Sequence, residues 1–154
     1  MKPLIETNTR ALNTAILLLR LMAGLILFVG GAGKVLGWFG GFGMTTTLQM
    51  FEKGTHLSAF LIYVSCFTEF IGGFLIMIGL ITRVAAIALM INMLTATLIT
   101  GFKNFFFGGA AYPCLLFVIF LVIVLSGPMA YSIDALLSKR KRTEAPKLNL
   151  SASF

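Results

Sequence analysis

The stretch LSAFLIYVSCFTEFIGGFLIMIGLIT, residues 57–82, decides the fold, because Glu69 is its only charged side chain. An α-helix rises about 1.5 Å per residue, so about 20 apolar residues cross the ~30 Å hydrocarbon core of a bilayer. The stretch exceeds that length. It therefore predicts a membrane-spanning helix with one buried acidic group.

Three other stretches of the chain have the same character. Residues 11–36 are apolar around Arg20, residues 84–100 carry no charge, and residues 110–126 end at Gly127-Pro128, a pair that terminates helices. The first stretch is too long for a cleaved signal peptide, and Arg20 would lie within its hydrophobic region, so we interpret it as a retained helix. The predicted fold is all-α: an integral membrane four-helix bundle with short interfacial helices.

Composition supports lipid as the main solvent. Of 154 residues, 58% are hydrophobic and 11% are charged, whereas soluble domains carry about 25% charged residues. Mean hydropathy is +0.99. Two cysteines and one histidine exclude a disulfide scaffold and bis-histidine haem ligation, and we expect no metal site and no covalently bound cofactor.

Charge placement predicts the topology. The net charge is +7, and the basic residues concentrate near the C-terminal end, which favours contact with a membrane surface over nucleic acid. Lysine and arginine placement puts both termini in the cytoplasm. Thr82-Arg83 forms a tight cytoplasmic turn, so the second and third spans should be antiparallel neighbours. We expect one membrane domain over residues 1–142 and a polar tail over residues 143–154.

The connecting segments predict shorter elements. Met44, Leu48 and Phe51 repeat at helical spacing within residues 37–56, which indicates a short helix in the membrane interface. The phenylalanine-rich loop 101–111 suits an interface or a lid over a lipid-facing cavity. After Pro128, Ser132 could cap a short helix with one apolar face.

Small and aromatic residues have predicted structural roles. Gly33 and Gly37 are four residues apart, a spacing that lets a helix approach a partner closely or lets the chain turn. Trp38 belongs to an aromatic belt at the interface. Gly72 and Gly73 follow Glu69 and permit tight helix packing.

Polar groups within the spans are the candidate functional residues. Counting residues inward from the ends of the spans brings Arg20, Glu69 and Asn92 to one depth, about 12–13 Å from the cytoplasmic edge. A charge at the bilayer centre costs roughly 2.5–3.5 kcal/mol on insertion scales, so these groups should be paired. They form either a salt bridge that fixes helix packing, or a polar site in which Arg20 polarises a carbonyl oxygen and Glu69 exchanges a proton.

Lys34 lies near the outer end of the first span. Its long side chain is expected to reach the headgroups. It is also a candidate ligand-binding residue, together with Tyr112.

Several strings resemble the DoxX family of small bacterial membrane proteins. They are Leu17-Leu18-Leu19-Arg20-Leu21, Gly33-Lys34 with Gly37-Trp38-Phe39-Gly40-Gly41, Glu69-Phe70-Ile71-Gly72-Gly73, Thr82-Arg83-Val84-Ala85-Ala86, Tyr112-Pro113 and Tyr131-Ser132-Ile133-Asp134.

The resemblance runs from about residue 17 to residue 137. It implies four helices in the bacterial inner membrane and an association with membrane redox systems, since some members resemble small subunits of thiosulfate:quinone oxidoreductase. Gly30, Thr100 and Ala111 stand where many members carry groups able to move protons. These departures put direct catalysis by this chain in doubt, so its status as an enzyme stays open.

Three functions are compatible with these observations. The first is an inner-membrane subunit of a quinone-linked oxidoreductase assembly, with Arg20, Glu69 and Asn92 lining a site for a quinone or lipid headgroup. The second is a non-catalytic membrane anchor or assembly factor for a redox or detoxification complex. The third is a small transporter or proton pathway. The expected partners are the lipid bilayer, proteins of a redox complex and, in an oligomer, further copies of the chain.

Overall fold

A computed structural model describes residues 9–55, 57–101, 105–106, 109–127 and 132–134 of the protein. Four long helices form the bundle: α1 (Thr9–Leu36), α3 (Ala59–Ile78), α4 (Thr82–Thr100) and α5 (Ala111–Ser126). Their ends agree with those of the predicted spans to within about two residues, except that α3 ends at Ile78, four residues before the end of the predicted span 57–82. The described residues contain no strand, and the predicted all-α fold is confirmed.

Three of these helices, α1, α3 and α4, are long and apolar enough to cross a membrane. The helix α5 is shorter, with 16 residues, and is apolar all round. The protein is therefore a membrane protein with a helical bundle. The polar tail predicted over residues 143–154 lies outside the described residues.

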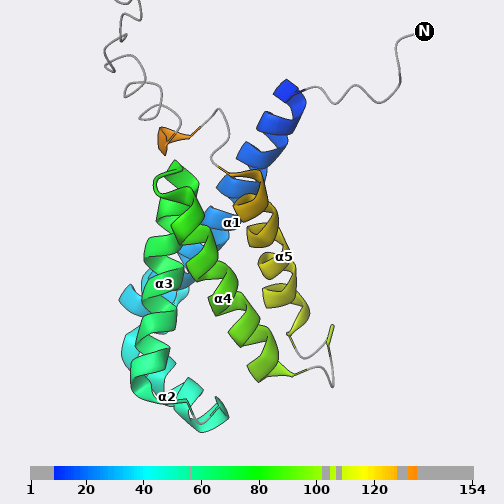
Figure 1. The fold of residues 1–154 in the computed structure, drawn as a ribbon. Coiled ribbons are helices and arrows are strands. Elements are labelled where there is room, and N and C mark those ends of the chain that lie inside the picture. Colours follow the sequence, from blue (N-terminus) through cyan, green and yellow to red (C-terminus); the bar gives the residue numbers. More distant parts are fainter. Residues whose placement is uncertain (1–8, 56, 102–104, 107–108, 128–131, 135–154) are drawn as a thin grey trace, which may run out of the picture.

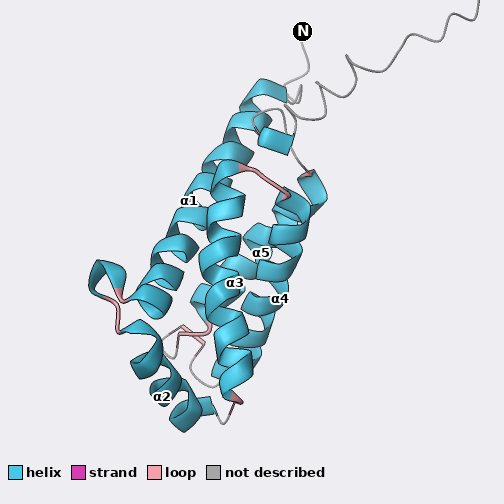
Figure 2. Ribbon diagram, turned by 90° about the vertical axis from the view of Figure 1, so that its left-hand side faces the viewer, coloured by secondary structure: helices cyan, strands magenta, loops and turns pink. Residues whose placement is uncertain are grey.

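The two ends of the bundle differ. At one end, which we call the turn end, Gly79, Leu80 and Ile81 join α3 to α4, and this makes α3 and α4 antiparallel neighbours as predicted (Figure 1). At the opposite end, the loop end, lie α2 (Gly43–Thr55) and a short 3-10 helix, η1 (Trp38–Gly40) (Figure 2). The predicted helix around Met44, Leu48 and Phe51 is thus present as α2.

Glycines bring α1 and α3 into backbone contact. A Cβ added to Gly31 would lie 2.5 Å from the Phe70 nitrogen, and one added to Gly73 would lie 2.6 Å from the Phe28 nitrogen. Both distances are too short for any side chain. The helices therefore pack at a separation that only glycine permits, as predicted for Gly73.

Gly72 faces α4 instead. A Cβ there would lie 3.0 Å from Leu89 Cγ. The pair Gly72-Gly73 thus lets α3 approach two neighbours at the same level, one on each side. The tight packing expected for both glycines is confirmed.

The packed core lies toward the turn end of the bundle, where all four long helices contribute to it. Its buried members are Ala23, Leu27, Ile76, Ala85, Ala86, Leu89, Met93, Leu116, Phe120 and Ile123. Toward the loop end α3 and α4 diverge (Figure 1). The space between them holds the candidate site.

Candidate functional site

An ion pair joins α1 to α3. Lys34 Nζ donates to Glu69 Oε2 at 2.5 Å, and the Glu69 side chain is 8% exposed whereas that of Lys34 is 34% exposed. Glu69 lies midway along α3. Because a helical side chain leans toward the N-terminus of its helix, Lys34 near the end of α1 reaches back toward the middle of the bundle. The expectation that Lys34 extends to the headgroups is wrong, because Glu69 holds its ammonium group.

Asn92 extends the pair to α4. Its Nδ2 donates to Glu69 Oε1 at 3.4 Å, and its Oδ1 accepts from Ser65 Oγ at 2.8 Å. The Ser65 bond fixes which way the amide faces, since a hydroxyl donates to the carbonyl oxygen and leaves the NH₂ group toward the carboxylate. Three helices thus meet in one hydrogen-bonded chain, and the predicted proximity of Glu69 and Asn92 is confirmed.

A cavity of about 710 Å³ opens beside this chain, between α3 and α4 and toward α2 and the start of α5. Most of its wall is apolar. Its polar lining residues include Lys34, Ser65, Thr68, Glu69, Asn92 and Tyr112. An apolar cavity of several hundred Å³ with a few convergent polar groups is the usual form of a small-molecule site.

Four of the five predicted ligand-binding residues line this cavity: Lys34, Glu69, Asn92 and Tyr112. Tyr112 lies at the first turn of α5 and is 53% exposed. The structure therefore brings these residues together on one surface. Whether that surface binds a ligand stays a prediction.

Arg20 is not part of the site, and the predicted contact between Arg20 and Glu69 is wrong. The guanidinium is 1% exposed, and its Nε and Nη2 each lie 3.4 Å from the Ile76 carbonyl oxygen. A Cβ on Gly79 would overlap Arg20 Nη2. Ile76 is seven residues beyond Glu69 on α3, which places Arg20 about 10 Å from the ion pair along the helix.

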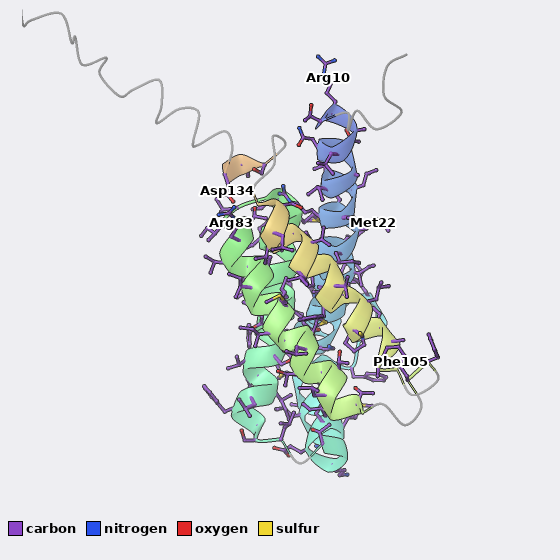
Figure 3. The ribbon with its side chains drawn as sticks, turned by 45° about the vertical axis from the view of Figure 1, so that its right-hand side comes forward. Arg10, Met22, Arg83, Phe105 and Asp134 are labelled. Carbon is purple, nitrogen blue, oxygen red and sulfur yellow. The ribbon has the colours of Figure 1, made fainter. Side chains whose placement is uncertain are left out.

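The error in depth has a physical cause. The prediction counted from Ala11 as the first residue inside the membrane, but α1 has 28 residues against 20 in α3. The N-terminal turns of α1 project beyond the bundle at the turn end, where Arg10 marks the tip (Figure 3). Arg20 therefore lies near the end of α3 rather than at its middle.

Asp134 organises the turn end. Its Oδ1 and Oδ2 accept hydrogen bonds from the Ile81 and Thr82 backbone N–H groups, each at 2.8 Å, and its own N–H donates to the Gly79 carbonyl at 3.1 Å. Burial raises the pKa of Asp134, but these N–H groups and the charge of Arg20 outweigh burial, so its pKa lies below the ordinary value. Asp134 thus fastens the segment after α5 to the start of α4.

Arg83 is exposed at the same end, as Figure 3 shows, and its guanidinium lies against Gly127 at the end of α5. The predicted short helix after Pro128 lies largely outside the described residues. Only Ser132, Ile133 and Asp134 of it are described, and the last two are helical.

The glycines of residues 33–41 make a turn. Gly37 has a φ of 72°, which favours glycine, and the chain reverses there so that Gly41 returns to the backbone of Gly33. Trp38 is 56% exposed on this turn at the loop end. That exposure agrees with the predicted interfacial aromatic, and the close backbone approach predicted for Gly33 is confirmed.

Three contacts were not predicted. The first is the Lys34–Glu69 ion pair, because counting residues from the ends of the spans paired Glu69 with Arg20 instead. Ser65 lies one helical turn before Glu69, and this spacing places both on one face of α3, which is a signal available in the sequence. Asp134 belongs to a string that resembles DoxX proteins, but its bonds to the α3–α4 turn join segments about 50 residues apart. No local pattern indicates such a pairing.

Comparison with known proteins gives two relatives and one family. The chain is 32% identical to "Putative oxidoreductase CatD" of Bacillus subtilis (strain 168) over 126 residues, covering 82% of this chain and 89% of the relative. It is 29% identical to the inner membrane protein YqjF of Escherichia coli (strain K12) over 140 residues, covering 83% and 95% of the two chains. No solved structure matches it significantly.

The DoxX family model matches residues 15–102, which include most of α1 and all of α2, α3 and α4. Of the polar lining residues named above, all except Tyr112 lie within the match. The match covers more than half of the sequence, so this chain belongs to the DoxX family.

Proposed function

We propose that this protein is an inner-membrane subunit of a quinone-linked oxidoreductase assembly, and that the cavity between α3 and α4 binds the quinone headgroup. The observation that carries the proposal is the Lys34–Glu69–Asn92 chain on the wall of an otherwise apolar cavity of about 710 Å³. A quinone has the matching form, with a flat apolar ring that carries two carbonyl oxygens.

Each polar group has a role in this site. An ammonium carries three donors, of which Glu69 takes one, so Lys34 has donors left for a quinone carbonyl. Reduction of a quinone adds two electrons and two protons. The electrons come from a redox partner subunit and both protons come from water. The Glu69 carboxylate takes up one of these protons and passes it to the quinone oxygen bound at Lys34, and the second proton reaches the other oxygen directly from water. Lys34 stabilises the negative charge that develops on that oxygen before the proton arrives.

The similarity to CatD, whose name places it among oxidoreductases, supports the redox assignment. YqjF is named as an inner membrane protein and supports the proposed location. Lysine and arginine placement supports cytoplasmic termini.

The test is a titration of the purified protein with a benzoquinone that carries a ten-carbon tail, followed by thermal unfolding in detergent. At a free concentration 100 times the Kd, a ligand that binds only the folded state adds about 2.7 kcal/mol of stability. We expect this stabilisation in the wild type and a reduction of at least tenfold in affinity for Asn92→Leu.

Asn13→Leu is the matched control, because it makes the same change on α1 outside the cavity lining. The control should bind as the wild type does. A wild type that responds no differently from a detergent blank contradicts the proposed function.

A second function, a membrane anchor for a redox complex, is favoured by the projection of α1 beyond the bundle (Figure 1). That segment offers a partner a helical surface at the turn end. The anchor function predicts that Lys34→Met combined with Glu69→Met leaves partner recovery in mild detergent unchanged, while Leu12→Glu on the projecting segment reduces it. Loss of recovery in the first variant, with folding retained, contradicts it.

A further inference from the structure

We infer that the cavity is filled sideways from the bilayer, through an opening between α3 and α4, by a neutral ligand that carries an apolar tail. This inference rests on the proposed function, since it concerns the same cavity, and it adds the route of entry and the chemical class. The observations are the divergence of α3 from α4, the exposure of the lining residues and the charge balance of the wall.

The opening lies where α3 and α4 separate. Near the turn end the helices touch, since a Cβ on Gly72 would lie 3.0 Å from Leu89. Farther toward the loop end, Asn92 on α4 links the two helices through its hydrogen bonds with Ser65 and Glu69 on α3, and the cavity lies beside these bonds. The gap therefore widens from the turn end to the loop end as a wedge, as Figure 1 shows for the two ribbons.

Apolar side chains form the rim of this wedge. Leu61 and Val64 on α3 are 51% and 46% exposed, and Ile91 on α4 is 56% exposed, yet all three line the cavity. A lining residue that is also half-exposed lies at a mouth. Since the exposed faces of α3 and α4 in a membrane protein contact hydrocarbon, this mouth opens to lipid tails rather than to water.

The polar groups lie deeper than the rim. Glu69 is 6% exposed, and Asn92 and Ser65 are partly buried, whereas the rim residues Leu61, Val64 and Ile91 are about half-exposed. A ligand that enters through the mouth would place its polar head on these groups and leave its tail between the helices and the bilayer. A tail-less, water-soluble molecule would gain nothing from the apolar rim.

The wall also selects by charge. Lys34 and Glu69 cancel each other, so the site offers hydrogen bonds without net charge. An anionic headgroup would have to compete with the Glu69 carboxylate for Lys34, and a cationic one would have to displace Lys34 from Glu69. A neutral head with a carbonyl or hydroxyl oxygen can accept a hydrogen bond from Lys34 without breaking the Lys34–Glu69 ion pair.

The experiment narrows the mouth and measures binding by mass spectrometry of the intact protein released from detergent. The mouth variants are Leu61→Trp and Ile91→Trp. Their controls are Ile71→Trp on α3, 51% exposed, and Leu98→Trp on α4, 61% exposed, because both residues face outward and do not line the cavity. Thermal unfolding checks that each variant is folded. If one of the two mouth variants is not folded, Val64→Phe is used in its place.

Four probes separate the outcomes: the decyl-tailed benzoquinone, the same ring without a tail, decanol and decyl phosphate. We expect the wild type and the controls to bind both neutral tailed probes. The mouth variants should bind them at least tenfold more weakly. The tail-less ring and decyl phosphate should bind the wild type at least tenfold more weakly than the tailed quinone or decanol.

If decanol binds, with the expected loss in the mouth variants, the lateral route is supported. If neither quinone binds in the same experiment, the proposed quinone function is contradicted. Equal binding of tailed probes by mouth and control variants would overturn the lateral route. Thr55→Trp narrows the cavity from the loop end instead. If it weakened binding of the tailed probes more than Ile91→Trp does, the lateral route would also be overturned.

Discussion

Lys34 on α1 and Glu69 on α3 form an ion pair whose two members are unequally buried, with the lysine side chain 34% exposed and the glutamate side chain 8% exposed. The pair joins the two helices that pack most closely through their glycines. It also forms part of the cavity wall. The same contact therefore contributes to packing and to the candidate site.

Unequal burial predicts unequal effects of mutation. Lys34→Met leaves a buried carboxylate without its cation, whereas Glu69→Gln leaves a lysine that can extend toward the headgroups. We expect Lys34→Met to lower the free energy of unfolding by about 3 kcal/mol, Glu69→Gln by about half as much, and the double variant by less than the sum. Denaturant unfolding in detergent measures the three values, and additive effects would contradict a coupled pair.

Close backbone packing predicts a contrast between two glycines. Gly73→Ala would force its Cβ against the Phe28 nitrogen at 2.6 Å, so α1 and α3 must separate, at a cost of about 1–3 kcal/mol. Gly30→Ala on α1 is the control, because nothing lies within 4 Å of its Cβ. It should be neutral or stabilising by up to about 1 kcal/mol. Equal thermal unfolding midpoints for the two variants would show that the interface tolerates a methyl group.

Asp134 predicts a dependence of stability on pH. Its pKa is below the ordinary value of about 3.9, so the folded state favours the carboxylate. The stabilisation is therefore present above about pH 5 and is lost as the pH falls through 4 and below. Asp134→Asn should cost about 1 kcal/mol at neutral pH, as loss of a helix cap does, and nothing at low pH.

Unfolding of the wild type and of Asp134→Asn, measured between pH 7 and pH 3, checks this. The two curves should converge on acidification. A difference in stability that stays constant over the range would mean that the Asp134 carboxylate charge does not act on the start of α4.

The position of Arg20 predicts that it affects stability and not ligand binding. Arg20→Gln removes the guanidinium from the Ile76 carbonyl and from the neighbourhood of Asp134, so the protein should unfold more easily. Its affinity for the tailed benzoquinone should stay within about twofold of the wild type, whereas Lys34→Met should lose at least tenfold. A tenfold loss of affinity in Arg20→Gln would contradict this prediction and would show that Arg20 contributes to ligand binding.

The helices could be predicted from the sequence because length and apolar composition alone determine where a chain crosses lipid. Residue depth could not be predicted equally well. The apolar run that begins at Ala11 is longer than a bilayer requires. The close contacts of Gly31 on α1 with α3, and of Gly73 on α3 with α1, fix the position of α1 along α3. That offset separates Arg20 from Glu69 and brings Lys34 to it.

The candidate site could be predicted only in part, because the sequence determines the relative depth of some helices and not of others. Glu69 and Asn92 lie on α3 and α4, whose short turn fixes their relative depth, and their contact followed from residue counting. The bonds of Asp134 join it to Ile81 and Thr82, more than 50 residues earlier in the chain. Their partners could not be identified from local spacing.

The packed core lies in one half of the bundle and the hollow in the other. Substitutions of the apolar lining residues on the rim, such as Leu61 and Ile91, should therefore alter the hollow without loosening the packed half. The rim of the hollow is therefore a region that protein engineers can redesign while the packed half of the bundle is kept constant.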